Sequence, residues 1–556
     1  MKLFLKNIYI ILLSLVAMLF STYALAKNNE AHYNKENISN YFQGIVSINK
    51  ASDEKVFNYL NRVQLLKDKH TKFNVEFVRN LILLEKFNEA VSFSKKIWKK
   101  EELFFEADLI LGLDYFIKKD YKNSEKHFER LNKISEYNFF FQDFMGNVLL
   151  AWNEAAQGNQ KESIEFLNKV PSPYRHIIKT QRTFMECYFD TKSSEIYFQK
   201  LIDDEKYNFS RYSFFLVNYL LHKNKNLEAK EIIKISRAKH NSNLLLKETE
   251  NLLLNSENKK IKVFFDCRNT RNVVAEFFYL IANLYSSERD YQLSNFYLKI
   301  SLLFNDKFLS NKALLAENYY FLRKNLMSKK YYNSIKTIGT VYSWYASKNI
   351  SRILINEKGK KYSVNFLKKE FDSISRKNFE HYYDLGNFYK ENEYYEESIK
   401  YYSLALKNIN EDHYLIPKIL DRRGTSYERI GNWEKAEIDL KKSLEILPDQ
   451  AHVLNYLAYT WIDKGINLDE GLKMLKKAAE LKKEDGYIID SLGWAHYAKE
   501  NYIEAEFFLQ KAVELLPLDP IINDHYADVL WMLNKDIQAR YVWKYILSLS
   551  DTEQKL

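Results

Sequence analysis

The composition of this 556-residue chain limits the folds it can adopt. It has only 13 glycines and 6 prolines, well below average usage, beside 42 tyrosines and 37 phenylalanines. Turns, bulges and phosphate-binding loops depend on glycine and proline, so a loop-rich fold is excluded and long helices with short connections remain. The net charge of +10 is divided into +20 for residues 1–378 and −10 for residues 379–556. The N-terminal lysines are interspersed with asparagine, isoleucine and tyrosine, so we expect no nucleic-acid role.

Residues 1–26 have the pattern of a bacterial secretory signal. Lys2 and Lys6 precede an apolar run over residues 8–20, and Ala24-Leu25-Ala26 forms a small-x-small cleavage site. We therefore expect export to the periplasm or the periplasmic face of a membrane, with an uncleaved anchor as the alternative. Residues 27–36 are mostly polar and are expected to form a flexible tail.

Residues 37–378 show a weak repeat with a period of about 34 residues. Units begin near Asn37, Thr71 and Phe105, and the same spacing returns between 275 and 309. Two windows, at about 241–274 and 343–378, have helical composition but fit the repeat pattern poorly. Residues 257–260 together with residues 267–269 are expected to form an irregular break in the array. In total we count thirteen units and two degenerate ones along the chain. The alternative is a generic amphipathic helical region that falls into this register by chance.

Two cysteines, Cys187 and Cys267, lie in this region. Export would place them in an oxidising compartment, where one disulfide is possible. In a linear array they would lie more than two units apart, whereas a disulfide needs Cα atoms within about 7 Å. We therefore expect two buried thiols that pack as small apolar side chains.

Residues 379–547 carry the clearest repeat. Gly386, Gly424, Ala458, Gly493 and Ala527 recur at nearly equal steps of about 34 residues. A second small residue stands twelve positions later in four units, at Ser398, Ala436, Ala505 and Ala539. Tightly packed antiparallel helices admit only small side chains where they cross, so the pattern predicts a stack of helix pairs. The last helix is expected over 538–547, before a polar tail at 548–556.

This pattern resembles the tetratricopeptide repeat, whose units carry small residues, aromatics and a closing proline at fixed offsets. The stretches GNWEKAEIDLKKSLEILP (431–448) and DSLGWAHYAKENYIEAEFFLQKAVELLP (490–517) carry the resemblance, and the end of the chain is similar to exported proteobacterial members. His496 and Asn534 depart from the pattern, where Tyr and Gly are usual. The resemblance implies an all-α, right-handed α-solenoid.

No catalytic constellation is visible in the sequence. It lacks H-E-x-x-H, G-x-G-x-x-G, G-x-x-x-x-G-K-[ST] and G-x-S-x-G motifs, and its eleven histidines are scattered. The poorly fitting windows are too short to hold a catalytic domain. We expect no enzyme activity, no cofactor and no metal.

The resemblance places ligand-facing positions on the first helix of each unit. Carried over residue by residue, it selects Tyr383, Asn387, Asp421, Asn455, Tyr459, Asp490, Trp494, Tyr497, Asp524, Asp528 and Trp531. Amides and carboxylates can bind an extended peptide backbone, and aromatics add flat contact area, so we expect a peptide-binding groove that prefers a basic partner. The alternative for the Trp and Tyr side chains is packing between neighbouring first helices.

We therefore expect a non-catalytic scaffold of the bacterial cell envelope that binds protein or peptide partners on its concave face. The alternative is a substrate-recruiting or regulatory subunit of a separate envelope enzyme, such as a peptidoglycan synthase, a protease or an outer-membrane assembly complex. Membrane contact is expected only through an uncleaved signal or a partner, and the sequence leaves the oligomeric state open.

Overall fold

The computed structural model describes residues 34–48, 52–68, 70–134 and 143–549. Within these ranges the chain forms thirty α-helices, two short 3₁₀ helices and no strand. No helix in the described ranges is long and apolar enough to cross a membrane. The expected signal at 1–26 lies outside them. Helix α2 begins at Lys35, so residues 35 and 36 are helical rather than part of the expected flexible tail at 27–36.

The chain divides into two compact units, 1–353 and 354–556. The first unit contains α2 (Lys35–Ser47), α3 (Asp53–Asn61), α4 (Thr71–Leu83), α5 (Phe87–Ile97), α6 (Phe105–Ile117), α7 (Tyr121–Lys133), α8 (Met145–Ala156), α9 (Gln160–Asn168), α10 (Arg175–Tyr188), α11 (Ser194–Ile202), α12 (Tyr212–His222), α13 (Asn226–Lys239), α14 (Leu244–Leu254), α15 (Asn258–Phe264), α16 (Thr270–Ser287), α17 (Tyr291–Phe304), α18 (Asn311–Phe321), α19 (Asn325–Ile335) and most of α20 (Thr340–Lys358). Its 3₁₀ helices are η1 (Gln64–Asp68) and η2 (Ser172–Tyr174).

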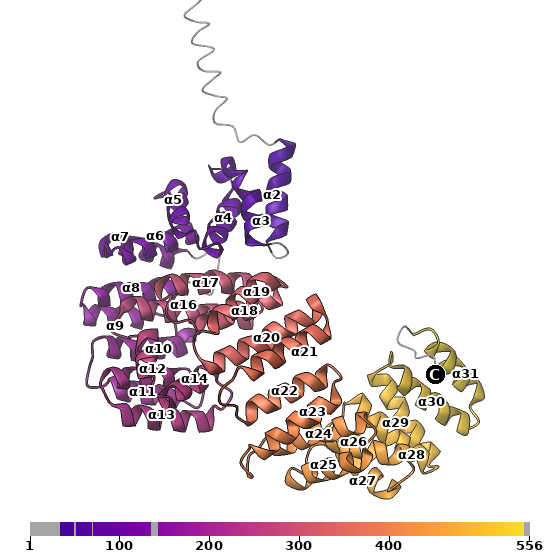
Figure 1. Ribbon diagram of the computed structural model, residues 1–556. Coiled ribbons are helices and arrows are strands. Elements are labelled where there is room, and N and C mark those ends of the chain that lie inside the picture. The colour runs from indigo at the N-terminus through magenta and orange to yellow at the C-terminus, as the bar shows by residue number, and fades with distance from the viewer. Residues whose placement is uncertain (1–33, 49–51, 69, 135–142, 550–556) are drawn as a thin grey trace, which may run out of the picture. The chain divides into compact units, whose positions relative to one another are not determined.

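The second unit holds the better-formed repeats. It contains the end of α20 and α21 (Lys360–Asp372), α22 (Phe379–Glu391), α23 (Tyr395–Lys407), α24 (Ile416–Arg429), α25 (Trp433–Ile446), α26 (Ala451–Asp463), α27 (Leu468–Leu481), α28 (Gly486–Ala498), α29 (Tyr502–Leu515), α30 (Pro520–Met532) and α31 (Asp536–Ile546). From α22 onward each helix packs against the next, and the succession of pairs can be followed in Figure 1. Thirty described helices match the fifteen units counted from the sequence.

Small residues mark the helix crossings, as the spacing predicts. A Cβ atom added to Gly493 would lie 2.6 Å from Leu509 Cγ, so this position admits no side chain. In the first unit the residue twelve positions later bonds back to the crossing: Ser124 donates to the Gly112 carbonyl at 3.0 Å, and Ser294 to the Ala282 carbonyl at 2.7 Å. Both hydroxyls are fully buried. Residues twelve positions apart therefore form a hydrogen bond between the two helices of a pair.

The turn between first and second helices also repeats, although no sequence motif marks it. At most of these turns one residue takes a left-handed conformation, as at Glu85 (φ 61°), Lys119 (φ 61°) and Glu500 (φ 61°). The amide after it closes the helix, as in Lys86 N–H to the Leu81 carbonyl at 2.9 Å. Glycine usually fills such positions, but the described turns mostly use other residues, which hides the period in the N-terminal half.

The first unit folds back on itself instead of forming a simple linear stack. Helix α17 packs against α4, and α16 packs against α8 and α10. Asp53 accepts a hydrogen bond from Tyr319 at 3.0 Å, and Glu85 pairs with Lys299 at 2.6 Å. Stability in this unit is therefore not limited to contacts between neighbouring repeats, since these contacts join repeats that are far apart in the chain.

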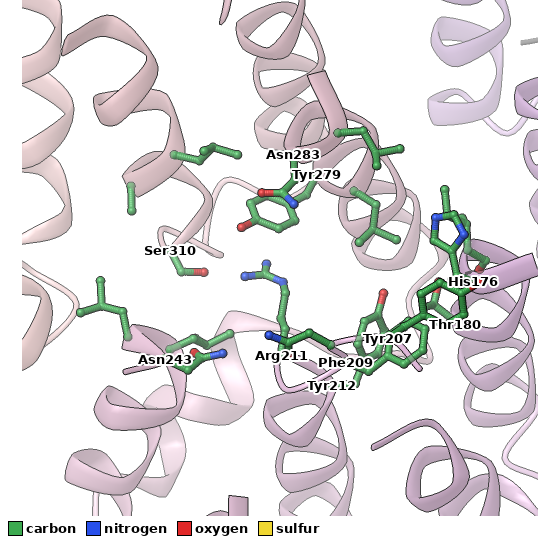
Figure 2. Close-up of a pocket in the computed structure, with 18 of the residues that line it drawn as sticks. His176, Thr180, Tyr207, Phe209, Arg211, Tyr212, Asn243, Tyr279, Asn283 and Ser310 are labelled. Carbon is green, nitrogen blue, oxygen red and sulfur yellow. Dashed lines mark hydrogen bonds between the residues drawn. The ribbon is translucent and has the colours of Figure 1, made fainter. Parts of the chain in front are cut away.

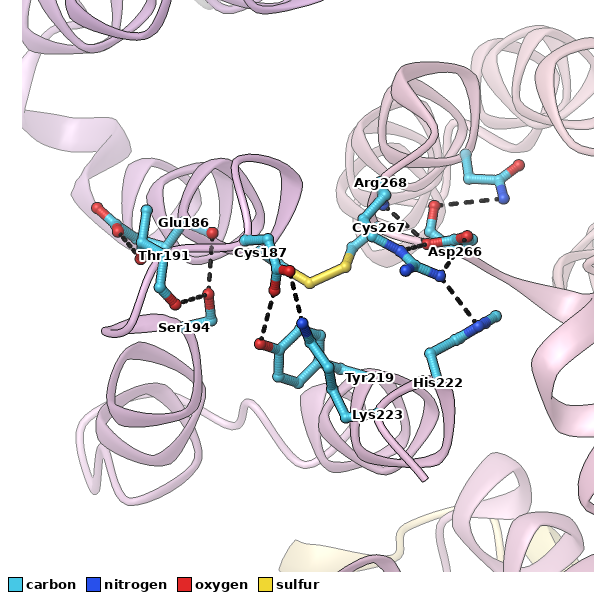
Figure 3. Close-up of a disulfide and its surroundings, with 12 residues drawn as sticks. Glu186, Cys187, Thr191, Ser194, Tyr219, His222, Lys223, Asp266, Cys267 and Arg268 are labelled. Carbon is cyan, nitrogen blue, oxygen red and sulfur yellow. Dashed lines mark hydrogen bonds and ion pairs between the residues drawn. A yellow bond between two sulfur atoms is a disulfide. The ribbon is translucent and has the colours of Figure 1, made fainter. Parts of the chain in front are cut away.

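The same folding back brings the two cysteines together. Cys187 at the end of α10 and Cys267 before α16 form a disulfide with Cα atoms 5.9 Å apart (Figure 3). Both are buried, and an ion pair between Lys223 and Asp190 lies beside them. The expectation of two separate thiols is wrong, because helices α10 and α16 pack directly against each other although they are several helices apart along the chain.

The two windows that fit the repeat poorly are nevertheless helical. The first contains α14 and the short α15, which begins at Asn258, inside the expected interruption. The irregular backbone lies over 265–269, a stretch that includes residues 267–269 of the expected interruption. The second window holds α20, of 19 residues, and α21. The first window thus departs from the repeat because its second helix, α15, is short, and the second window because its first helix, α20, is long.

Candidate functional site

The eleven residues selected from the sequence all lie on first helices of the second unit. Their positions are α22 for Tyr383 and Asn387, α24 for Asp421, α26 for Asn455 and Tyr459, α28 for Asp490, Trp494 and Tyr497, and α30 for Asp524, Asp528 and Trp531. We call this set the first-helix face. Ten members are partly or fully exposed, and Asp490 alone is buried.

At the α22 end the face is already occupied by its own contacts. The side-chain oxygen of Asn387 accepts hydrogen bonds from Tyr402 Oη at 2.9 Å and from Arg422 Nη1 at 2.6 Å. The Arg422 guanidinium also lies 5.7 Å from the Tyr383 ring centre. This part of the face therefore presents a cation, which the acidic pattern of the predicted residues did not indicate.

Asp421 and Asn455 follow on the next two first helices. Burial raises the pKa of Asp421 against the opposing charges of Lys390 and Arg422. The side-chain oxygen of Asn455 is shielded from solvent and has no hydrogen-bond partner among the described residues. A buried acceptor without a donor is costly, and because the residue itself is only partly buried, rotation of its side chain would bring this oxygen to the surface.

Asp490 forms the centre of a buried contact between α28 and α30. Its carboxylate oxygens lie 3.0 and 3.1 Å from Nδ1 of His525. Burial lowers the pKa of His525, but the hydrogen bond and the charge of Asp490 outweigh it, so the pKa is raised overall. Trp494 stacks on His525 with ring centres 4.1 Å apart and on Tyr497 at 4.6 Å. For Trp494 the geometry matches the packing alternative.

The α30 end of the face is the most open. Asp524 accepts a hydrogen bond from Trp543 Nε1 at 3.0 Å. Asp528 makes no hydrogen bond or ion pair with any described residue, and burial together with the charge of Asp524 raises its pKa. Trp531 is 44% exposed, with its ring centre 5.8 Å from that of Trp543. A free acceptor and a half-exposed indole thus lie on the same helix.

Two residues of this face were missed by sequence reasoning. Arg422 and His525 directly follow the selected residues Asp421 and Asp524 in the sequence. Each contacts a residue one unit earlier, Asn387 and Asp490 respectively. Including the residue that follows each of these two aspartates would have found both.

The described residues contain no group of three or more His, Cys, Asp or Glu side chains placed to hold a metal ion. The acidic residues at the α30 end are partly bound to Trp543 and His525. What the arrangement offers is hydrogen-bond acceptors and aromatic surface, which suit recognition of another chain.

The described residues form an all-helical stack of helix pairs, and the first-helix face lies on the first helices of its second unit. Residues 380–412 match the tetratricopeptide repeat family. These residues therefore contain a tetratricopeptide repeat, which lies within an all-α stack of helix pairs.

Two curated relatives match part of the chain. A TPR repeat-containing protein of Pseudomonas aeruginosa is 31% identical over 99 residues, which cover 18% of this chain and 17% of the relative. A UDP-N-acetylglucosamine–peptide N-acetylglucosaminyltransferase of Giardia intestinalis is 27% identical over 225 residues, which cover 38% of this chain and 14% of that enzyme. The chain therefore spans less than a fifth of the length of either relative.

Several solved structures are similar to part of the chain. A tetratricopeptide repeat protein from Parabacteroides merdae aligns with a TM-score of 0.33 and 19% identity, over 38% of this chain and 80% of its own. MamA of Desulfovibrio magneticus aligns with a TM-score of 0.29 and 15% identity, over 33% of this chain and 99% of its own. YrrB, described as a TPR protein with an unusual peptide-binding site, aligns with a TM-score of 0.26 and 21% identity, over 31% of this chain and 86% of its own.

Proposed function

We propose that this protein is a non-catalytic adaptor that binds a protein or peptide segment on the first-helix face of its second unit. The observation that carries the proposal is the Asp528 carboxylate, which is partly exposed and has no hydrogen-bond or ion-pair partner among the described residues, on the same helix as the half-exposed Trp531. Repeat arrays use such extended surfaces for binding, and nothing in this face provides a nucleophile paired with a base.

The partner that suits this face is a segment rich in N–H donors and basic side chains. After rotation of its side chain, the Asn455 oxygen, which has no partner among the described residues, would accept a backbone or side-chain N–H. Asp528 would pair with a Lys or Arg side chain, and that pairing would hold its carboxyl in the charged form. The cation at Arg422 restricts this preference to the α26 to α30 part of the face.

We propose further that the chain acts in the bacterial cell envelope. The disulfide between Cys187 and Cys267 supports this location, because such bonds persist in oxidising compartments. The signal-like residues 1–26 support it as well.

The test is photocrosslinking in cells. A photoreactive amino acid replaces Trp531, and the same residue replaces Ile438, which is 64% exposed on the second helix α25, as a matched control. We expect the same partner to be captured repeatedly at position 531 and not at 438, and a crosslinked segment that contains Lys or Arg.

Asp528→Asn should then reduce this crosslink and weaken the salt dependence of binding by the purified partner, since one ion pair is lost. Identical capture at both positions, or a crosslink indifferent to Asp528→Asn and to Asn455→Leu, would contradict the proposal.

A further inference from the structure

A separate cavity of about 500 Å³ lies in the first unit (Figure 2). First helices α10, α12, α14, α16, α18 and α20, or the loops that precede them, provide its walls. We call it the Arg211 pocket and define it by His176, Tyr207, Arg211, Tyr279, Asn283 and Glu317. Its volume lies within the range of small-molecule sites.

Arg211 forms the base of this pocket. Its Nε and Nη2 atoms donate to the two carboxylate oxygens of Glu276 at 2.8 and 2.9 Å, and Nη2 also donates to Asn311 at 2.8 Å. The guanidinium stacks on the Tyr279 ring, 3.9 Å from its centre. The remaining nitrogen, Nη1, has no hydrogen-bond partner among the described residues, and Figure 2 shows the guanidinium directed into the open space. The Nη1 group, with its two N–H donors, is therefore left for a ligand.

The charges that surround this donor are balanced. Glu276, which is fully buried, offsets Arg211. Burial raises the pKa of Glu317, whose carboxyl accepts a hydrogen bond from the Tyr345 hydroxyl. Burial also lowers the pKa of His176, which favours its neutral form. At the base of the pocket Glu276 neutralises Arg211, so an anionic ligand would gain no net positive charge there, and a cationic one would lie against Arg211. Lys206 lies at the rim, with its ammonium group 5.5 Å from the centre of the Tyr207 ring.

The rim combines aromatic rings with amides. Tyr207 stacks on His176 with ring centres 5.4 Å apart. Asn283 is exposed at the edge and makes no hydrogen bond with any described residue, so both its donor and its acceptor are available. The pocket thus offers ring faces together with several separate hydrogen-bonding groups.

We propose that the Arg211 pocket binds an uncharged saccharide of one or two rings. A sugar ring has an apolar face that can lie on tyrosine, and hydroxyl groups that both donate and accept hydrogen bonds. Arg211 Nη1 would donate to a sugar oxygen, Asn283 and Glu317 would bond to hydroxyls, and Tyr207 would contact the ring face. A purely apolar ligand would leave the Arg211 donor unpaired in a low-dielectric site, which is unfavourable.

The test uses the full-length protein and saturation-transfer NMR with maltose, lactose and N,N′-diacetylchitobiose, each at up to about 10 mM. Glucuronate and glucosamine serve as the anionic and cationic comparisons. We expect at least one neutral disaccharide to bind and the charged sugars to bind at least tenfold more weakly. Tyr207→Ala and Asn283→Ala should each weaken binding at least fivefold with unchanged thermal unfolding, whereas Leu326→Ala on the exposed face of α19 should have no effect.

Arg211→Lys keeps the charge opposite Glu276 but removes the fork that supplies Nη1, and it should abolish binding. If this variant unfolds, the two rim variants still decide the outcome. Absence of binding by all three disaccharides, tighter binding of a charged sugar, or binding unchanged in both rim variants would overturn the proposal.

Discussion

The carboxylate of Asp53 and the ammonium group of Lys324 lie 2.7 Å apart, although 271 residues separate them in the chain. Both side chains are buried, and the Tyr319 hydroxyl donates a second hydrogen bond to Asp53. This contact joins the first repeat of the unit to its later repeats.

Removing one partner of this pair should destabilise the first unit strongly. Lys324→Met leaves the Asp53 carboxylate buried without its counter-ion, and we expect a loss of about 3–5 kcal/mol. The matched control is Lys99→Met, which breaks an exposed pair with Glu102 and should cost less than about 1 kcal/mol. Urea unfolding followed by circular dichroism measures both. A similar small loss in both variants would show that the buried contact contributes nothing.

Breaking the disulfide should also lower the stability of the first unit. Its cysteines are 80 residues apart, and closing a loop of that length stabilises a fold by about 4 kcal/mol in the chain-entropy account. We expect a reducing agent to lower the unfolding temperature of the wild type. The Cys187→Ser/Cys267→Ser variant should already unfold at the lower temperature and show no response to the agent. Equal unfolding temperatures with and without reductant in the wild type would refute this.

The crossing of α28 and α29 should not tolerate a larger residue. In Gly493→Ala the new methyl group would lie 2.6 Å from Leu509 Cγ and 3.1 Å from the Leu509 backbone nitrogen. We expect a loss of about 1–3 kcal/mol from overpacking. Glu500→Gly, in the turn between the same helices, is the control and should be neutral or mildly stabilising, because its φ of 61° suits glycine. Thermal unfolding distinguishes the two.

The contact between Asp490 and His525 predicts a pH dependence. The pKa of His525 is raised above the ordinary value of about 6.5, so its protonation stabilises the folded second unit. That contribution is fully present below about pH 6.5 and is lost as the pH rises through the raised pKa. His525→Gln should therefore lose more stability at pH 6 than at pH 8. NMR titration of the imidazole gives the pKa directly, and a value at or below 6.5 would contradict the prediction.

Much of the architecture could be predicted from the sequence because it depends on local spacing. Gly386, Gly424 and Gly493 marked real helix crossings, since the need for a small residue recurs in every tight pair. The disulfide and the contact of Asp53 with Lys324 could not be predicted, because nothing in the period of the repeat says that a stack will fold back on itself.

The candidate face was predicted only in part, for a similar reason. The register placed all eleven residues on first helices, but it could not show that Asp490 is bound to His525 or Asn387 to Arg422. These contacts depend on how far neighbouring units are rotated, which spacing within one unit does not specify.

The folding back of the first unit also constrains how this chain could have lengthened. A repeat inserted between α10 and α16 would shift Glu85 away from Lys299 and Asp53 away from Lys324, and would separate the cysteines. Duplication of a unit there would break these three contacts at once. Beyond α22, where each helix packs mainly on its immediate neighbours, an added unit would require only one new interface of the kind already present. Growth by duplication is therefore expected to have been tolerated chiefly in the C-terminal part of the protein.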